Sequence, residues 1–144
     1  MTDTNATTVR IDFDTTFTPK TFEDGEESLL RIASLGLHTS QSGNTSLKVK
    51  FEHPTDPTYE DVFEYFSLPQ GADREGGEDR KKDNRCKLRL KSLQDCFSID
   101  INSVDMANPE ANSAVGAEGY CILAKETDQQ YGDRNRIKTF TVTR

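Results

Sequence analysis

The sequence contains no tryptophan, and histidine, cysteine and long apolar runs are all scarce. A membrane-spanning helix needs about 20 consecutive, mostly apolar residues. No such run occurs, so no membrane partner is expected. Residues 1–8 have neither the basic nor the apolar region of a signal peptide, which predicts a cytoplasmic protein. The three cysteines are therefore expected to stay reduced and to pack as small hydrophobic side chains.

The residue patterns of common catalytic and metal sites are also missing. The cysteines form no C-x-x-C pair, and neither His38 nor His53 lies near a cysteine in sequence, so no metal site is expected. There is no G-x-x-x-x-G-K-[ST] phosphate loop and no G-x-S-x-G nucleophile elbow. The sequence therefore predicts a protein that is not an enzyme and that holds neither a metal nor a cofactor.

Positive charge, by contrast, is concentrated in one segment. Between residues 80 and 91, seven basic residues stand against one acid, Asp83, so this stretch carries +6 in a protein of net charge −7. An acidic protein that gathers its cations in this way is expected to use them for a phosphate-bearing partner. The alternative is a solvated helix face that only keeps the protein in solution.

The same segment carries the clearest helical pattern. Its apolar positions recur at helical spacing and fall on one stripe, formed by Cys86, Leu90, Leu93 and Phe97. A helix within residues 79–97 is therefore predicted to pack this stripe against a core while its cationic head faces solvent.

Five segments have the pattern of β-strands: residues 28–39, 45–53, 59–68, 115–126 and 136–143. The first is expected to bend at Gly36, because glycine inside a strand often marks a bulge. A short helix is the competing interpretation of that segment, because its apolar spacing is ambiguous.

The second and third strands alternate most clearly. Lys48 and Lys50 point away from the apolar face of the second strand. In the third strand, Phe63 and Tyr65 lie on the face opposite Glu64 and its apolar neighbours. Aromatic residues on both faces imply that one set is core and the other is covered or used.

Three strands, one helix and two strands follow the plan of the five-stranded OB barrel, in which a helix between strands 3 and 4 closes one end. We therefore predict a mainly β, OB-like barrel over residues 28–144. Residues 1–27 are predicted to form a polar arm that docks loosely through Phe13, Phe17 and Phe22. Other β-rich folds with one helix remain open, because element order does not prove topology.

Three short segments resemble a known family. They are T-S-Q-S-G-N at residues 39–44 leading into L-K-V at 47–49, V-F-E-Y-F at 62–66, and G-D-R-N-R-I-K-T-F at 132–140. Together with the strand order, they resemble the phage-encoded OB-fold single-stranded DNA-binding proteins, long described as phage proteins of unknown function. The resemblance implies a protein of the host cytoplasm that coats single-stranded DNA with little sequence preference during phage replication or recombination. Phage replication or recombination proteins would then be partners, and the oligomeric state is left open.

Single-strand binding needs cations along the phosphates and exposed rings on which bases stack. OB domains bind ligands mainly on strands two and three and on the loops that join strands one to two and four to five. On this plan the candidate DNA-binding residues of the barrel are Lys48, Lys50, Phe63, Tyr65, Tyr131, Arg134, Arg136 and Lys138. The helix contributes a further set, namely Arg80, Lys81, Lys82 and Arg85.

Each of these assignments has a structural alternative. Phe63 and Tyr65 are equally suited to a core, and any half-buried strand exposes lysines such as Lys48. Asp61 and Glu64 weigh against an exposed groove, because carboxylates repel phosphate. The helix cluster would lie at the bottom of an OB barrel, where it could contact a wrapping strand or an acidic neighbouring subunit. The functional alternatives are a protein–protein adaptor whose acidic surface meets a basic partner, and a virion or regulatory protein that uses the barrel structurally.

Overall fold

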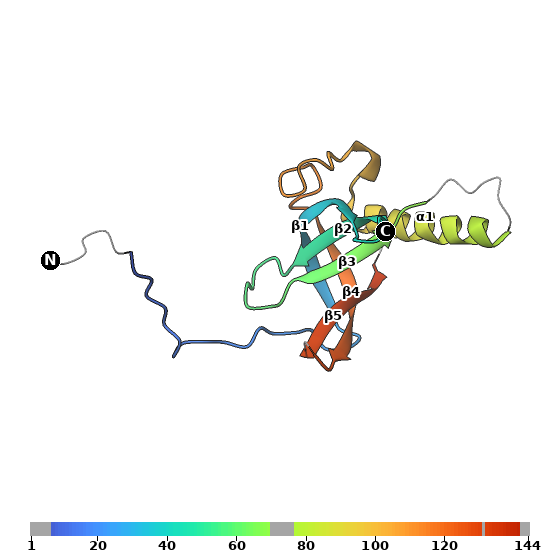
Figure 1. Cartoon of the computed structure of the whole chain (residues 1–144). Coiled ribbons are helices and arrows are strands. Elements are labelled where there is room, and N and C mark those ends of the chain that lie inside the picture. Colours follow the sequence, from blue (N-terminus) through green and yellow to red (C-terminus); the bar gives the residue numbers. More distant parts are fainter. Residues whose placement is uncertain (1–6, 70–76, 131, 142–144) are drawn as a thin grey trace.

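The computed structural model describes residues 7–69, 77–130 and 132–141, and most of its regular structure is β (Figure 1). The strands are β1 (Glu27–Thr39), β2 (Thr45–Glu52), β3 (Val62–Ser67), β4 (Glu118–Asp128) and β5 (Gly132–Phe140). The helix α1 (Gly77–Phe97) lies between β3 and β4, and the short 3-10 turn η2 (Ile101–Ser103) follows it. The predicted mainly β class, with five strands and one α-helix between the third and fourth, is confirmed.

The strands form one antiparallel sheet in the order β3-β2-β1-β4-β5. The sheet curls until its two edge strands, β3 and β5, lie in contact. Over the residues that the structure describes, no ladder of backbone hydrogen bonds joins those edges. The prediction of a closed barrel is therefore wrong, and the sheet remains open along the seam between β3 and β5.

Strand boundaries differ from the predicted ones for local reasons. β3 begins at Val62 and not at residue 59, because Tyr59 forms a parallel bridge with Lys20 instead. β5 begins at Gly132, four residues before the predicted start, because polar residues there continue the hairpin with β4. Alternation of apolar residues cannot detect such a polar hairpin end. The last residues of the predicted fifth strand, 142 and 143, lie outside the described part of the chain.

The core lies on the concave side of the curled sheet. The inward residues of β1, β2, β3 and β4 are buried there, together with the C-terminal half of α1. Phe22 is also 1% exposed and belongs to this core, so it does not dock loosely as predicted, whereas Phe13 and Phe17 are exposed.

Helix α1 has two halves with different surroundings. In the C-terminal half, Leu93, Cys96 and Phe97 are buried in the core, which confirms that end of the predicted stripe. Cys86 and Leu90 are only partly buried. The N-terminal half extends beyond the sheet (Figure 1). In the described part of the chain, no helix combines the length and apolar character needed to cross a membrane.

The bend in β1 does not lie at Gly36. The register with β2 shifts between Ile32 and Ser34, which makes Ala33 the extra residue of a β-bulge. Gly36 is required for a different reason: a Cβ atom there would lie 2.7 Å from the Cβ of Pro109. The segment containing Pro109 runs along β1, where the Pro109 carbonyl accepts a 2.9 Å hydrogen bond from the Leu35 amide.

Gly36→Ala is expected to lower the free energy of unfolding, because the new methyl group would overlap the Pro109 ring. Overpacking of this kind typically costs about 1–3 kcal/mol. Chemical denaturation measures the loss, and Ser34→Ala on the same face of β1 is the matched control. Equal stability of the two variants would contradict the close approach.

Candidate functional site

The outward surface of β1, β2 and β3 brings together four of the predicted site residues. Because side chains alternate along a strand, burial of the apolar residues of β2 turns Lys48 and Lys50 outward. Burial of Val62, Glu64 and Phe66 in β3 turns Phe63 and Tyr65 outward in the same way. Phe63 is 42% and Tyr65 is 47% exposed, so neither ring belongs to the core.

Lys48 lies between the two rings. β2 and β3 pair so that Lys48 stands opposite Tyr65 and Lys50 stands opposite Phe63. The Lys48 ammonium is 5.4 Å from the centre of the Phe63 ring and 5.8 Å from that of Tyr65. Both distances are within the range of cation–π attraction. The lysine therefore holds a positive charge at the edge of an exposed aromatic surface.

His38 belongs to the same surface, although the sequence did not identify it as a site residue. Its ring meets Tyr65 edge-on, with 5.4 Å between centroids. The signal was present in the alternation of β1, since Ser34, Gly36 and His38 share one face. We call His38, Lys48, Lys50, Phe63 and Tyr65 the aromatic face.

The aromatic face borders two shallow hollows. One, of about 400 Å³, is lined by Lys48, Lys50 and Phe63 together with His38 of β1. The other, of about 670 Å³, is lined by His38, Tyr65 and residues of the turn between β1 and β2. His38 lines both, so the hollows are adjacent and run from the rings to the β1–β2 turn.

Acidic groups at the border reduce the positive charge of this surface. Lys50 is 3.4 Å from Asp61, with 38% and 39% of the two side chains exposed. Exposed pairs of this kind are weak and are screened by salt. Glu110 lines the smaller hollow as well. The cationic character of the aromatic face therefore depends mainly on Lys48.

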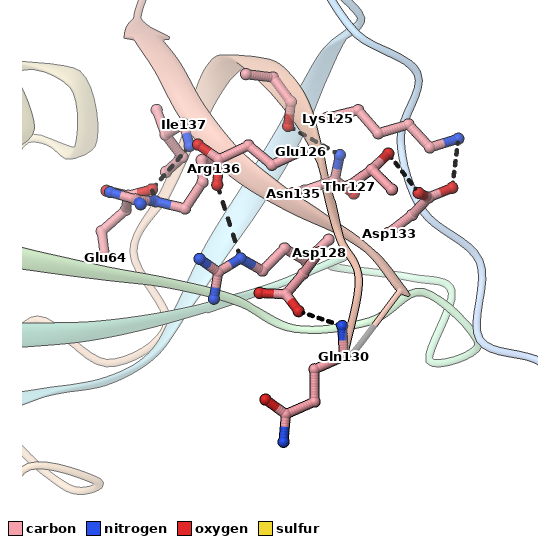
Figure 2. A network of polar contacts seen from close by, with 12 residues as sticks. Glu64, Lys125, Glu126, Thr127, Asp128, Gln130, Asp133, Asn135, Arg136 and Ile137 are labelled. Atoms are coloured by element: carbon pink, nitrogen blue, oxygen red, sulfur yellow. Dashed lines mark hydrogen bonds and ion pairs between the residues drawn. The ribbon is translucent and has the colours of Figure 1, made fainter.

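A buried carboxylate, that of Glu64, joins β3 to Arg136 and Ile137 of β5 (Figure 2). Glu64 is 0% exposed, and its side chain accepts hydrogen bonds from the Arg136 Nε at 2.8 Å and from the Ile137 backbone N–H at 2.8 Å. It also accepts a hydrogen bond from Arg89 of α1 at 2.7 Å. The carboxylate thus occupies the seam where a β3–β5 ladder would run, which explains why the sheet is not closed.

The two arginines bound to Glu64 are structural in this arrangement. The hydrogen bond with Glu64 raises the pKa of Arg136 above its ordinary value, and the nearby carboxylate charges add to the rise. Arg89 also donates to the backbone carbonyl of Tyr65 at 3.0 Å and stacks 4.1 Å from the Phe66 ring. Glu64 points into the core, so the objection that it would repel phosphate from an exposed groove does not apply.

The remaining predicted site residues of β5 lie away from the aromatic face. Arg134 is exposed, 3.7 Å from Glu126, and Lys138 is exposed at a bulge in β5. Neither lines the two hollows. Tyr131 falls outside the described residues.

The basic residues of α1 form a separate surface. Arg80, Lys81, Lys82 and Arg85 are exposed on the N-terminal half of the helix, which extends beyond the sheet (Figure 1). None of them lines the hollows beside the aromatic rings. The helix cations are therefore separate from the face that carries the rings.

The described residues offer no metal centre, since no three His, Cys, Asp or Glu side chains gather within ligating distance among them. Comparison of the sequence with protein-family models and with curated proteins found no match. The resemblance to phage single-stranded DNA-binding proteins therefore stays a prediction.

Glu64→Ala is expected to destabilise the fold severely, because it leaves two guanidinium groups and the Ile137 N–H without their acceptor. Breaking a buried ion pair costs about 3–5 kcal/mol, and partial exposure of both arginines places the expected loss near 3 kcal/mol. Glu64→Gln keeps an acceptor and should lose less. Denaturant unfolding measures both, with Glu126→Ala as the exposed control. A loss at Glu64 no larger than that of the control would refute the bridging role.

Proposed function

We propose that the protein binds single-stranded DNA on the aromatic face, as a coating protein that is not an enzyme. The observation that supports this most directly is the placement of Lys48 between the exposed rings of Phe63 and Tyr65. Bases stack on exposed rings, and a cation beside them attracts the phosphate that follows each base. The adjacent hollows provide room for a strand to pass across β1, β2 and β3.

This chemistry favours binding with little sequence preference. Every base has a flat π-face, so stacking accepts any of them, whereas sequence is read by hydrogen bonds to base edges. The aromatic face consists mainly of rings and ammonium groups. The net charge of −7 does not oppose such binding, because the local potential at the face governs the encounter.

The place of this activity in phage replication or recombination is supported only by the sequence resemblance. A protein–protein adaptor is the alternative that the acidic net charge favours, with a basic protein as its partner. Binding to single-stranded DNA distinguishes the two, because an adaptor would not require it.

Removing either ring is expected to weaken binding to a fluorescent oligo(dT). One stacked base contributes about 1–3 kcal/mol, so Phe63→Ala and Tyr65→Ala should each raise Kd by about 5- to 150-fold. Tyr65→Phe keeps the ring and should bind nearly as well as the native protein. Tyr120→Ala removes a ring of similar exposure, 49%, from β4 and is the matched control. Equal losses of affinity in the Tyr65 and Tyr120 variants would contradict the assignment of the aromatic face as the binding site.

Lys48→Ala is expected to change the salt dependence of the same binding. Each phosphate contact to a single strand adds about 0.7 to the slope of log K against log salt concentration. Loss of Lys48 should lower the slope by about that amount, whereas Lys91→Ala on α1 should leave it unchanged.

Absence of binding to the single strand even at low salt would refute the proposed function. Binding of duplex DNA as tightly as oligo(dT) would also contradict it, because paired bases cannot stack on protein rings.

A further inference from the structure

The N-terminal arm carries the most exposed apolar side chains of the described chain. All residues from 7 to 20 are exposed. Val9 and Phe13 are each 79% exposed, Phe17 is 69% exposed and Ile11 is 59% exposed. The arm extends away from the sheet (Figure 1). Exposed apolar groups gathered on one segment indicate a surface that binds something.

The arm has the pattern of a β-strand without a partner. The apolar side chains of Val9, Ile11 and Phe13 alternate with the charged side chains of Arg10 and Asp12, which is the pattern of a strand with one apolar face. The run is closed by a turn: the Asp12 side chain accepts hydrogen bonds from the backbone N–H groups of Asp14 at 2.9 Å and Thr15 at 3.3 Å. The alternating run of residues 7–13 therefore ends in a turn that bends the chain at Phe13 and Asp14.

The base of the arm is anchored firmly. Lys20 forms a backbone bridge with Tyr59, and the Phe22 side chain is buried in the core. The Asn135 side chain accepts from the Phe22 N–H at 2.7 Å and donates to the Phe22 carbonyl at 2.9 Å. The arm therefore leaves the folded part of the chain at a fixed position beside β5.

The sheet offers an edge of the kind that such a segment pairs with. β5 is the last strand of the sheet, and its Ile137 N–H points away from β4 toward Glu64. Because N–H directions alternate along a strand, those of Asn135 and Asp133 point the same way. Unpaired strand edges recruit strands from other chains.

Charge favours the edge of β5 over that of β3. The arm carries Asp12 and Asp14 against one cation, Arg10, whereas β5 exposes Arg134 and Lys138 against one acid, Asp133. The approach to β3 is acidic, with Asp61 exposed at its start. Like charges placed opposite each other on neighbouring strands are destabilising, whereas opposite charges are favourable.

We propose that residues 7–13 add as a β-strand to the β5 edge of a second copy of this chain. The added strand would pair with the outward backbone groups of Asp133 and Asn135, because the N–H of Ile137 already donates to Glu64, and it would remove Val9, Ile11 and Phe13 from water. The contact does not involve the aromatic face, so it goes beyond the proposed function and does not depend on it.

Hydrogen exchange of the full-length protein, read by mass spectrometry at low and high protein concentration, tests the proposal. Amides of residues 7–13 and of residues 132–136 should both become protected as concentration rises, and sedimentation velocity should show assembly over the same range. Protection of the arm that is independent of concentration would mean that it folds onto its own chain, which would overturn the proposal. Absence of protection at high concentration would overturn it as well.

Proline substitutions in the arm make the test sharper, because residues 10 and 11 are exposed in the single chain and the core should stay folded. N–H directions alternate, so either Arg10→Pro or Ile11→Pro must remove an interstrand hydrogen bond. That variant should weaken association by about tenfold or more. Ile11→Val, which keeps the strand pattern, should associate as the native chain does. Native-like association of both proline variants would refute strand addition.

A charge exchange identifies the edge. Arg134→Glu should weaken association by about two- to fivefold, in the range of exposed ion pairs. Adding Asp14→Arg to the Arg134→Glu chain should restore association, because the new arginine in the arm of one copy then meets the new glutamate in β5 of the other. Arg85→Glu on α1 is the matched control with the same change in net charge. An equal effect of Arg85→Glu would show that only overall charge matters and would overturn the choice of β5.

Discussion

The carboxylate of Glu64 is the interaction on which the open sheet depends. A buried charge is costly to desolvate, and that cost is offset only when good hydrogen bonds surround it. Here the donors come from three directions: the guanidinium groups of Arg89 and Arg136, and the backbone of Ile137. β3, β5 and α1 thus meet at one side chain. Without a ladder across the seam, this cluster replaces the backbone pairing that would close a barrel.

The same cluster determines what the outer surface presents. Because strand residues alternate in direction, fixing Glu64 inward fixes Phe63 and Tyr65 outward. Arg89 reinforces this through its hydrogen bond to the Tyr65 carbonyl. The helix therefore supports the aromatic face from behind with Arg89, while its exposed cations lie elsewhere. The basic residues that form one cluster in the sequence therefore have two roles in the structure. Arg89 binds the buried Glu64, whereas the basic residues of the N-terminal half of α1 are exposed.

The outward positions of the aromatic face could be predicted from the sequence, whereas the contacts across the seam between β3 and β5 could not, and the reason is physical. Alternation along β2 and β3 is a local property, so the outward positions of Lys48 and Phe63 could be inferred from neighbouring residues. Glu64 could not be placed, because a carboxylate among apolar residues normally indicates surface and its partner Arg136 is 72 residues away. Phe22 was missed similarly, since its anchor Asn135 is 113 residues away. Long-range polar pairs leave no periodic signal.

The separation of surfaces also explains how an acidic protein can present a cationic site. Exposed charges are screened beyond about 8 Å at physiological ionic strength, so an approaching phosphate responds to Lys48 and its immediate neighbours more than to distant carboxylates. Two acids border the aromatic face: Asp61 pairs with Lys50, and Glu110 lines the smaller hollow together with Lys50 and His38. If the aromatic face binds single-stranded DNA as proposed, the strand should follow the larger hollow toward the β1–β2 turn, because the described residues that line this hollow include no carboxylate.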